Sequence, residues 1–578
     1  MSVAANALSS IEKRLPDTHN NMNPKYAALS IVMSATLAAC TAHQPAANEG
    51  ATPPLPFQAA CAALATQSLE SGRIMTAELV PAGTVPMWGG SSPVPAHCKV
   101  HAKLNERVGI DNKPYAIGIE LRLPENWNRR FLFQGGGGTD GVLGTAIGAA
   151  AVGDAPNALS LGYAVVATDA GHLNEPGIEG PYLFGADPQA RIDYGYNHLP
   201  VVTNAARTLI QTVYREKPAH SYFVGCSNGG RQGMMASQRF PELFDGVIAI
   251  APANRVTDAS LDALAQTQLL ASIAPRAANG RPQLGAALSS ADMNVLGKGI
   301  LARCDALDGV EDGMVLHPAQ CNFDPASVQC AANEKSECLA AEKVDVIRKL
   351  FAGAKDANGQ PVYTRWAYDP GINSPGWTIW KMGPPDAMPP QAINTTLVAG
   401  AMSHVFRTPP LMTSDLYGFM LETNLDELRT AFRHVEPPFT ESGERFVNAT
   451  STDVAAFAAR GGKLIFLHGM ADGIFAPQDS IDYMEGLKRE HGARADAFTR
   501  LYLVPGMGHC AGGPATDSFD ALGALTRWVE DGAAPDALLA KANPQSPFKG
   551  RTRPLCAYPK QATYKGGDIE SAASFTCE

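Results

Sequence analysis

The chain has 578 residues, of which 45% are hydrophobic and 18% charged, and its formal net charge is −10. This is the composition of a globular protein, and the acidic balance argues against nucleic acid as a partner. A chain of this length exceeds one core of ordinary size, so we expect one large domain that carries an insertion, or two domains.

The N-terminus has the pattern of an export signal. A single lysine precedes an apolar run from Ala27 to Ala38, which is too short to span a bilayer, and a small-residue cleavage site ends in Cys40. The pattern resembles a bacterial lipoprotein signal in which Cys40 is lipidated, and an ordinary secretory signal is the alternative. We interpret residues 1–39 as an upstream extension and signal and residues 40–60 as a linker. The protein is then exported, as a periplasmic or outer-membrane lipoprotein or in secreted form, and a lipid at Cys40 would be its only membrane contact.

Ten of the eleven cysteines remain when Cys40 is set aside. An even number in an exported chain predicts five disulfides, although sequence alone does not fix their pairing. Short loops favour two pairs, stapling of the two chain ends suggests two more, and elimination leaves one long-range pair. In that order the pairs are Cys304–Cys321, Cys330–Cys338, Cys61–Cys98, Cys556–Cys577 and Cys226–Cys510.

Short β-branched and aromatic runs bounded by turn residues recur in two blocks, within residues 115–252 and 463–506. Helical patterns separate several of these runs. Strands that alternate with helices predict βαβ units and a mostly parallel sheet with helices on both faces. We therefore predict an α/β core formed by residues 61–252 and 462–578.

Residues 253–461 interrupt this rhythm. The segment is rich in proline, glycine, aspartate and aromatic residues, and it contains four of the cysteines. We interpret it as an inserted lid domain over the carboxyl edge of the sheet, where α/β proteins bind ligands. Two domains in series are the alternative, but strand patterns return after the insertion.

The pentapeptide Gly225-Cys226-Ser227-Asn228-Gly229 matches the G-x-S-x-G pattern of a nucleophile elbow, and it lies between a predicted strand and a predicted helix. The two glycines permit a sharp turn that lifts the serine hydroxyl out at the edge of the sheet. Ser227 is therefore the predicted nucleophile.

A serine becomes nucleophilic when a histidine takes its proton and a carboxylate orients that histidine. On this fold the chain order is serine, acid, histidine. Asp472 and His509 each follow a late strand pattern and are the predicted acid and base. Asp479 is the alternative acid. We interpret His468 as a packed histidine at a strand end and His172 as a structural or supporting group.

A disulfide between Cys226 and Cys510 would join the residue before the predicted nucleophile to the residue after the predicted base. Such a bond would fix the distance between Ser227 and His509, which proton transfer requires within hydrogen-bond reach. The Cys226 thiol would then be consumed and could not compete with the serine.

With these motifs the chain resembles the tannase/feruloyl esterase family of serine hydrolases, from about Cys61 to Cys577. The stretches that carry the likeness are CDALDGVEDG, YFVGCSNGGRQGMM, LVPGMGHC and RTRPLCAYP. The resemblance implies an α/β-hydrolase core with a lid, ester hydrolysis through an acyl-enzyme, and the same triad of Ser227, Asp472 and His509. It also implies the disulfide between Cys226 and Cys510.

The oxyanion of an acyl-transfer intermediate requires two preorganised backbone N–H groups. The elbow itself offers the N–H of Asn228. The second should come from the glycine run at residues 135–138, and the resemblance suggests Gly138. A flexible turn is the alternative interpretation of that run.

Three carboxylates lie within eight residues of the lid, at Asp305, Asp308 and Asp312. They would repel one another unless a hard cation joined them, and oxygen ligands suit Ca²⁺. The resemblance implies a structural calcium ion held by these side chains and the carbonyl groups of Val310 and Met314. A solvated acidic loop is the alternative.

The resemblance implies a small aromatic ester as substrate, with Trp380 against its ring, although lid aromatics more often form core. Family members that hydrolyse mono-hydroxyalkyl terephthalates hold the free carboxylate with a lid arginine and carry an acid where this chain has Asn228. Residues 381–406 contain no arginine, and Ile393 aligns with that position. Arg407 is the nearest substitute.

We therefore expect hydrolysis of an aromatic carboxylic ester, with a mono-hydroxyalkyl terephthalate or similar benzoate ester first and a feruloyl or galloyl ester second. A peptidase, an acyltransferase and a non-catalytic binding protein are the alternatives, because one scaffold supports several functions.

Overall fold

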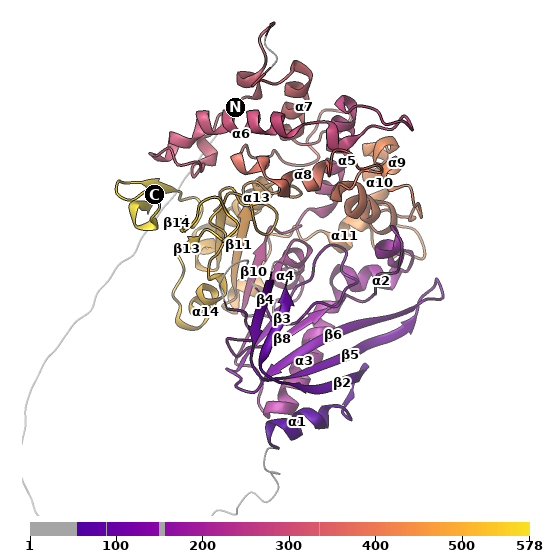
Figure 1. Ribbon diagram of the computed structural model, residues 1–578. Coiled ribbons are helices and arrows are strands. Elements are labelled where there is room, and N and C mark those ends of the chain that lie inside the picture. Colours follow the sequence, from indigo (N-terminus) through magenta and orange to yellow (C-terminus); the bar gives the residue numbers. More distant parts are fainter. Residues whose placement is uncertain (1–54, 88–89, 150–155, 334–335) are drawn as a thin grey trace, which may run out of the picture. The chain divides into compact units, whose positions relative to one another are not determined.

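Figure 1 shows the computed structural model, which describes residues 55–87, 90–149, 156–333 and 336–578. The predicted signal and Cys40 lie outside these residues. In the described part of the chain, no helix is both long and apolar enough to cross a membrane.

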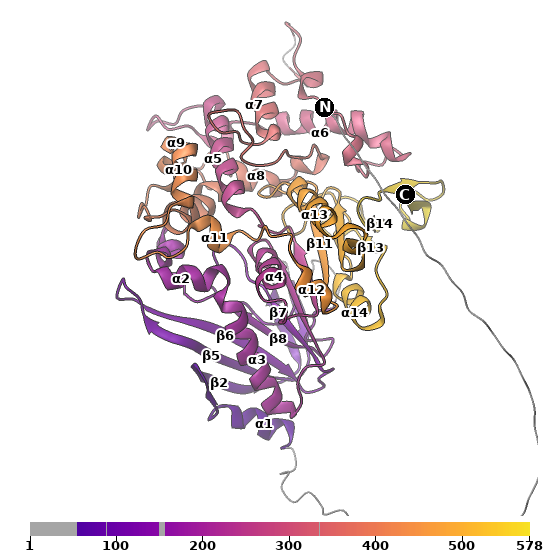
Figure 2. The ribbon, with the colours of Figure 1, turned by 180° about the vertical axis from the view of Figure 1, so that it is seen from behind.

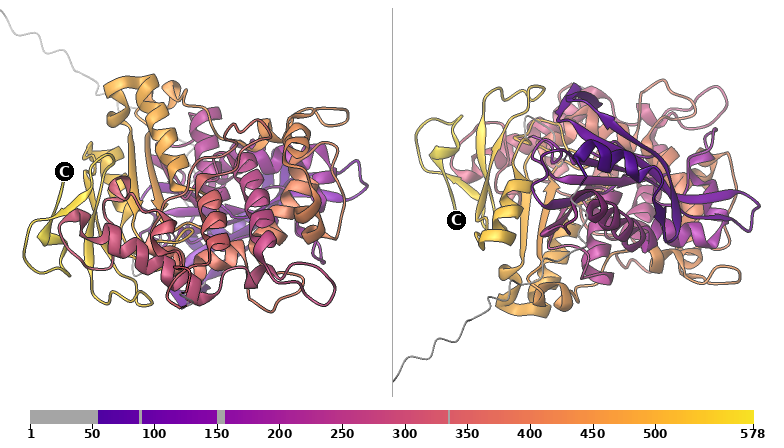
Figure 3. Two further views of the ribbon diagram at one scale, coloured as in Figure 1. Left: turned by 90° about the horizontal axis from the view of Figure 1, so that it is seen from above. Right: turned by 90° about the horizontal axis from the view of Figure 1, so that it is seen from below.

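The central sheet has ten strands in the order β1-β2-β5-β6-β8-β7-β9-β10-β11-β12. Their bounds are β1 (Ser68–Leu69), β2 (Gly72–Val80), β5 (His97–Val108), β6 (Pro114–Pro124), β7 (Arg130–Gln134), β8 (Ala164–Thr168), β9 (His220–Cys226), β10 (Gly246–Ile250), β11 (Lys463–Gly469) and β12 (Thr499–Val504). Neighbours from β8 to β12 are parallel, and the pairs from β1 to β8 are antiparallel. Figure 3 shows part of the antiparallel half from below, in indigo.

Three small antiparallel pairs lie outside this sheet. They are β3 (Gly83–Met87) with β4 (Gly90–Val94), β13 (Ala537–Lys541) with β14 (Thr552–Cys556), and β15 (Ala562–Tyr564) with β16 (Phe575–Cys577).

Alternate residues of the parallel strands pack on opposite faces of the sheet, as the pleat requires. Phe131 and Phe133 of β7 belong to one buried cluster, and Leu132 belongs to another. The first cluster is covered by α1 (Phe57–Leu64), α3 (His198–Tyr214), α4 (Asn228–Arg239), α12 (Ala455–Ala459) and α13 (Pro477–His491), several of which face the viewer in Figure 2. The second cluster is covered by α14 (Ala521–Asp531). Helices cover both faces of the part of the sheet from β8 to β12, whose strands are parallel. This arrangement confirms the predicted α/β fold.

Helix α3 shows why these segments are helical. Its buried residues Leu199, Val202, Ala206 and Leu209 recur every three or four positions and form one apolar stripe against the sheet. Each such Leu or Val contributes about 1.5–3 kcal/mol when it is fully buried. The helix ends at Arg215, whose φ of 59° is left-handed.

Between β10 and β11 the chain forms a mainly helical segment where the lid is predicted, and we keep the name lid for this segment. Its helices are α5 (Val256–Ile273), α6 (Ser290–Cys304), α7 (Ala341–Ala352), α8 (Pro375–Lys381), α9 (Leu416–Glu422), α10 (Leu425–Arg433) and α11 (Gly443–Val447). They share a hydrophobic cluster of their own and gather in the upper part of Figure 1. The short helix α2 (Pro188–Ile192), from the core part of the chain, adds Ala190 to that cluster.

All five expected disulfides are present, with the predicted partners. The bond between Cys226 and Cys510 joins residues 284 positions apart, with Cα atoms separated by 5.9 Å. Five disulfides are typical of a protein from an oxidising compartment, which supports export.

Candidate active site

Ser227 lies at a sharp turn between β9 and α4. Its φ of +61° is unusual for a residue with a side chain and costs on the order of 1–3 kcal/mol. A Cβ atom on Gly225 would lie 2.5 Å from the backbone of Gly229, and one on Gly229 would lie 2.5 Å from the carbonyl oxygen of Gly136. Both positions of the motif therefore require glycine, and the strained turn has the predicted form of a nucleophile elbow.

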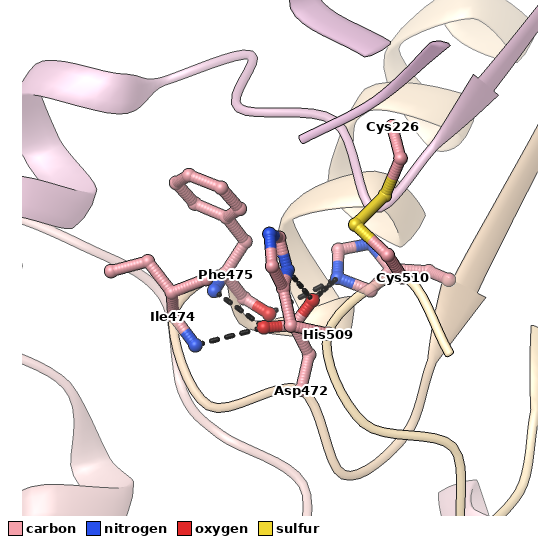
Figure 4. The surroundings of a disulfide bond; sticks show 7 residues. Cys226, Asp472, Ile474, Phe475, His509 and Cys510 are labelled. Atoms are coloured by element: carbon pink, nitrogen blue, oxygen red, sulfur yellow. Dashed lines mark hydrogen bonds and ion pairs between the residues drawn. A yellow bond between two sulfur atoms is a disulfide. The ribbon is translucent and has the colours of Figure 1, made fainter. Parts of the chain in front are cut away.

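Asp472 and His509 come together at the carboxyl ends of β11 and β12, as Figure 4 shows. Nδ1 of His509 lies 2.8 Å from Oδ2 of Asp472. The other carboxylate oxygen accepts hydrogen bonds from the N–H groups of Ile474 at 2.8 Å and Phe475 at 3.0 Å. The acid is thus fixed by its own loop, and an Nδ1–H donor leaves Nε2 as the acceptor nitrogen of a neutral imidazole.

The electrostatics keep this acid ionised. Burial by itself would raise the pKa of Asp472, but its interactions with His509 and His468 outweigh burial and hold the pKa well below its usual range. Nε2 of His468 lies 3.5 Å from Oδ2 of Asp472. His468 is fully buried, as expected for a packed histidine, but it also supports the acid, which the sequence did not reveal.

The disulfide between Cys226 and Cys510 lies beside His509 (Figure 4). A ring nitrogen of His509 and both sulfur atoms lie within 4.8 Å of one another. Because Cys226 directly precedes Ser227, the bond holds the elbow next to the imidazole. The His509 side chain is only 9% exposed, so the site is largely shielded from water.

Two aromatic rings contact the histidine. The ring of Trp380, in α8 of the lid, meets His509 edge-on at a centroid distance of 5.0 Å. Phe475, which lies in the loop of the acid, meets the His509 ring at a centroid distance of 5.5 Å. The structure thus places the predicted ring-contacting tryptophan at the site. Sequence reasoning missed Phe475, although its position three residues after the acid was an available signal.

The lid is bonded directly to the loops that hold the acid and the base. Oδ2 of Asp369 accepts a hydrogen bond from the N–H of Gly506, three residues before His509, at 3.1 Å. A Cβ atom on Gly371 would lie 2.7 Å from the side chain of Ala471, which precedes the acid. These contacts leave no room for a side chain at Gly371 and hold the lid against both loops.

Lys381 and Arg407 are the cationic residues that flank the arginine-free segment of the lid, and both donate to oxygen atoms of neighbouring residues. Lys381 is buried, donates to Oε1 of Gln266 at 2.5 Å and lies 3.8 Å from the ring centroid of Trp366. Burial lowers the pKa of Lys381, although the negative charge of Asp262 acts in the opposite direction. Arg407 is half-buried, and its Nε donates to the carbonyl oxygen of Pro409 at 3.1 Å. Lys381 thus serves lid packing, and a role for Arg407 in binding stays a prediction.

The glycine run at residues 135–138 is the second backbone segment that would supply an oxyanion donor. The N–H of Gly135 donates to Val224 and that of Gly136 donates to Gln232, so neither is free for an oxyanion. Gly137 and the predicted Gly138 remain as candidates in this run, and the φ of +58° at Gly138 suits glycine. Asn228 is the first residue of α4, where backbone N–H groups have no partner within the helix.

The alternative residues lie elsewhere. Asp479 is 3.6 Å from Arg255 and lines a cavity of about 500 Å³, whose lining includes none of Ser227, Asp472 and His509. His172 stacks on Phe184 at 3.7 Å, and burial lowers its pKa to about 3. Nδ1 of His509 is therefore bonded to Asp472 and not to Asp479, and the interpretation of His172 as a structural or supporting group stays a prediction.

The acidic lid loop at Asp305, Asp308 and Asp312 offers oxygen donors that fit calcium. Oδ2 of Asp308 is buried without a hydrogen-bond partner in the described chain, and burial, with the charges of Asp312 and Asp305, raises the pKa of Asp308 to about 7. Asp312 is paired with Arg553. The oxygen donors and the unpartnered carboxylate oxygen suit a hard cation, although these aspartates are not as tightly gathered as Cys226, His509 and Cys510, whose sulfurs are already bonded to each other.

Comparisons with known proteins agree with this geometry. Residues 98–578 match the family model described as tannase and feruloyl esterase. The chain is 39% identical over 566 residues to mono(2-hydroxyethyl) terephthalate hydrolase of Piscinibacter sakaiensis, covering 91% of this chain and 92% of that protein. It is 29% identical to a probable feruloyl esterase of Arthroderma benhamiae, covering 83% and 85%.

A solved structure shows the same fold. The crystal structure of feruloyl esterase B from Aspergillus oryzae superposes with a TM-score of 0.73 at 24% identity, covering 90% of this chain and all of that one. The chain belongs to the tannase and feruloyl esterase family of carboxylic ester hydrolases.

Proposed function

We propose that the enzyme hydrolyses esters of aromatic carboxylic acids through an acyl-enzyme on Ser227. The Ser227 hydroxyl attacks the ester carbonyl while Nε2 of His509 takes its proton, and the histidine then returns that proton to the departing alkoxide. Water, activated by the same histidine, attacks the acyl-enzyme, and the acid is released as Ser227 regains its proton. Asp472 keeps its charge throughout and stabilises the imidazolium.

One observation carries this proposal most directly. The hydrogen bond of 2.8 Å between His509 and Asp472 lies beside a disulfide that tethers the strained Ser227 turn. The developing oxyanion would be met by the N–H groups of Gly138 and Asn228, each of which is worth about 10²–10³ in kcat at a preorganised site.

The aromatic acyl group is supported by Trp380 and Phe475, whose rings border the histidine. A monoester of terephthalic acid is our first candidate, because the 39% identical relative is named for that substrate. Feruloyl or galloyl esters are the second. They are favoured by the lack of an arginine in residues 381–406 and by feruloyl esterases among the relatives. Arg407 is the proposed carboxylate partner in the first case.

We also propose that Asp305, Asp308 and Asp312, with the carbonyl groups of Val310 and Met314, hold a structural Ca²⁺ when it is bound. The ion would supply charge neutralisation and no chemistry at the triad. Arg551 donates to the carbonyl oxygen of Asp312, so the loop also joins the lid to the C-terminal segment. EDTA should therefore lower the melting temperature and added Ca²⁺ restore it. A melting temperature unchanged by EDTA, with no calcium found by elemental analysis, would rule out this calcium site.

The experiment is an ester panel on the protein without residues 1–39. Terephthalate, ferulate and gallate esters and a peptide amide are compared at equal enzyme concentration, with Ser227→Ala as the reference. We expect turnover of at least one aromatic ester and its loss in Ser227→Ala. Retained turnover in that variant, with normal circular dichroism, would reject the mechanism, and cleavage of the amide alone would reject the substrate class.

A further inference from the structure

A chain of buried side-chain hydrogen bonds lies directly behind the candidate oxyanion hole. Asn228 donates through Nδ2 to Oδ1 of Asp140, and Gln232 donates through Nε2 to Oδ2 of the same carboxylate at 2.8 Å. Arg231 donates through Nε to Oδ1 of Asn228 at 2.7 Å, and the N–H of Gly136 donates to Oε1 of Gln232 at 3.1 Å. The four side chains of this set, Asp140, Asn228, Arg231 and Gln232, are each at most 6% exposed.

This network joins the two backbone segments that would supply oxyanion donors. Asp140 follows Gly138 by two residues, and its carboxylate reaches across to the side chain of Asn228. A Cβ atom on Gly136 would lie 2.6 Å from Oδ2 of Asp140, so the carboxylate also presses on the glycine loop. The Asp140 carboxylate thus fixes the distance between the glycine loop and the start of α4.

The orientation of each group in the network is fixed. Arg231 also donates through its terminal NH₂ groups to the carbonyl oxygens of Gly195, Tyr194 and Val447. Turning the Asn228 amide around would place its NH₂ group against the Arg231 donor. The amide must therefore direct its oxygen to Arg231 and its NH₂ to Asp140, and it is not available to a substrate.

We propose that Asp140 is a positioning residue of the oxyanion hole, which acts through the side chains of Asn228 and Gln232 to set the distance between the two backbone donors. The inference rests on the proposed function, because the oxyanion forms only if Ser227 is the nucleophile. It gives a role to the side chain of Asn228, whose amide bonds both Asp140 and Arg231.

Two single substitutions break the network and their combination restores it. In Asp140→Asn an NH₂ group must face the amide of Asn228 or that of Gln232, and in Asn228→Asp two carboxylates face each other. In the double variant, the new amide at 140 can donate to the carboxylate at 228 and accept from Gln232, while Arg231 still finds an acceptor. Every donor then has a partner.

With 4-nitrophenyl benzoate as substrate, each single variant should lose about 10²-fold in kcat with KM changed less than about threefold, because a displaced oxyanion donor acts only in the transition state. The double variant should recover to within about tenfold of the parent enzyme. Phenylboronic acid, which forms a tetrahedral serine adduct, should bind each single variant more weakly by a similar factor. A merely structural carboxylate would not shift boronate affinity together with kcat.

Asp193→Asn is the matched control. Asp193 is also buried and accepts from the side-chain amides of Gln189 and Asn197, but it is not bonded to either oxyanion segment. Its variant should keep kcat within about twofold even where the melting temperature falls. Should Asp140→Asn fail to fold, Gln232→Leu removes the hydrogen bonds of Gln232 to Gly136 and to Asp140 but leaves the bond between Asp140 and Asn228, and it should lower kcat about tenfold at constant KM.

The proposal is overturned if folded single variants keep their kcat and boronate affinity, or if a folded double variant is no better than the worse single variant. A failure of the proposed function has a different signature. There Ser227→Ala retains turnover and phenylboronic acid does not inhibit the parent enzyme, and the positioning role falls with the nucleophile.

Discussion

The carboxyl edge of the sheet and the lid contribute to the site in different ways. Ser227, Asp472 and His509 each lie within five residues of a strand end, so the register of β9, β11 and β12 determines their positions along the sheet edge. Trp380 belongs to a seven-residue helix that depends on side-chain contacts for its position. We infer that changes at the sheet edge should alter kcat, whereas changes in the lid should alter substrate preference and stability.

The largest expected effect is at the acid. Asp472→Asn should lower kcat about 10⁴-fold, because the amide no longer holds the histidine in the required tautomer. Asp479→Asn, at a buried carboxylate of the same region that does not contact His509, is the control and should lose little activity. Steady-state kinetics on one aromatic ester measures both, and a reversed order of effects would assign the acid to Asp479.

The two regions can also be compared through their disulfides. Replacing Cys226 and Cys510 with serine should lower the free energy of unfolding by roughly 2–5 kcal/mol and also reduce kcat, because the bond joins the elbow to the histidine loop. Replacing Cys330 and Cys338, which close a lid loop 8 residues apart, should lower stability less and leave kcat unchanged. Denaturant melts and kinetics separate the outcomes. Equal kcat values in the two double variants would show that the site does not need the tether.

A lid substitution should change selectivity. Trp380→Ala removes a ring that borders the site, so kcat/KM for a benzoate ester should fall about tenfold, corresponding to about 1.4 kcal/mol of lost aromatic contact. The acetate ester of the same alcohol lacks the acyl ring and should lose less than about threefold. Equal losses on both esters would mean that Trp380 supports the histidine and not the substrate.

The last prediction concerns stability alone, at the contact between the lid and the histidine loop. Burial raises the pKa of Asp369 to about 6, although N–H groups of Gly371 and Gly506 oppose the shift. The folded state therefore binds an additional proton between about pH 4 and 6, and this contribution to stability is lost as the pH rises through 6. In Asp369→Asn the carboxyl titration is absent.

The stability of Asp369→Asn relative to the parent protein should accordingly improve by on the order of 2 kcal/mol between pH 4 and pH 7. Urea unfolding at several pH values measures the difference. A constant difference across that range would mean that Asp369 keeps an ordinary pKa in the folded protein.

Local patterns were enough to predict the α/β core and the turn at the elbow, whereas the pairing of Cys226 with Cys510 came from elimination and from the family resemblance. Glycines at 225 and 229 constrain the backbone in a way that a pentapeptide reveals, and Asp472 and His509 follow recognisable strands. The network of Asp140 was not predictable, because its bond to Asn228 spans 88 residues and depends on side-chain rotamers. The lid helices were also not predicted individually, since several have only five to nine residues and show too few turns for a period to emerge.

The most direct test is covalent labelling by diethyl 4-nitrophenyl phosphate followed by peptide mass spectrometry. The account predicts one diethylphosphoryl group per molecule, located on Ser227, formed in step with loss of esterase activity and much more slowly in Asp472→Asn. A label on another residue, or full inactivation without modification of Ser227, would contradict it.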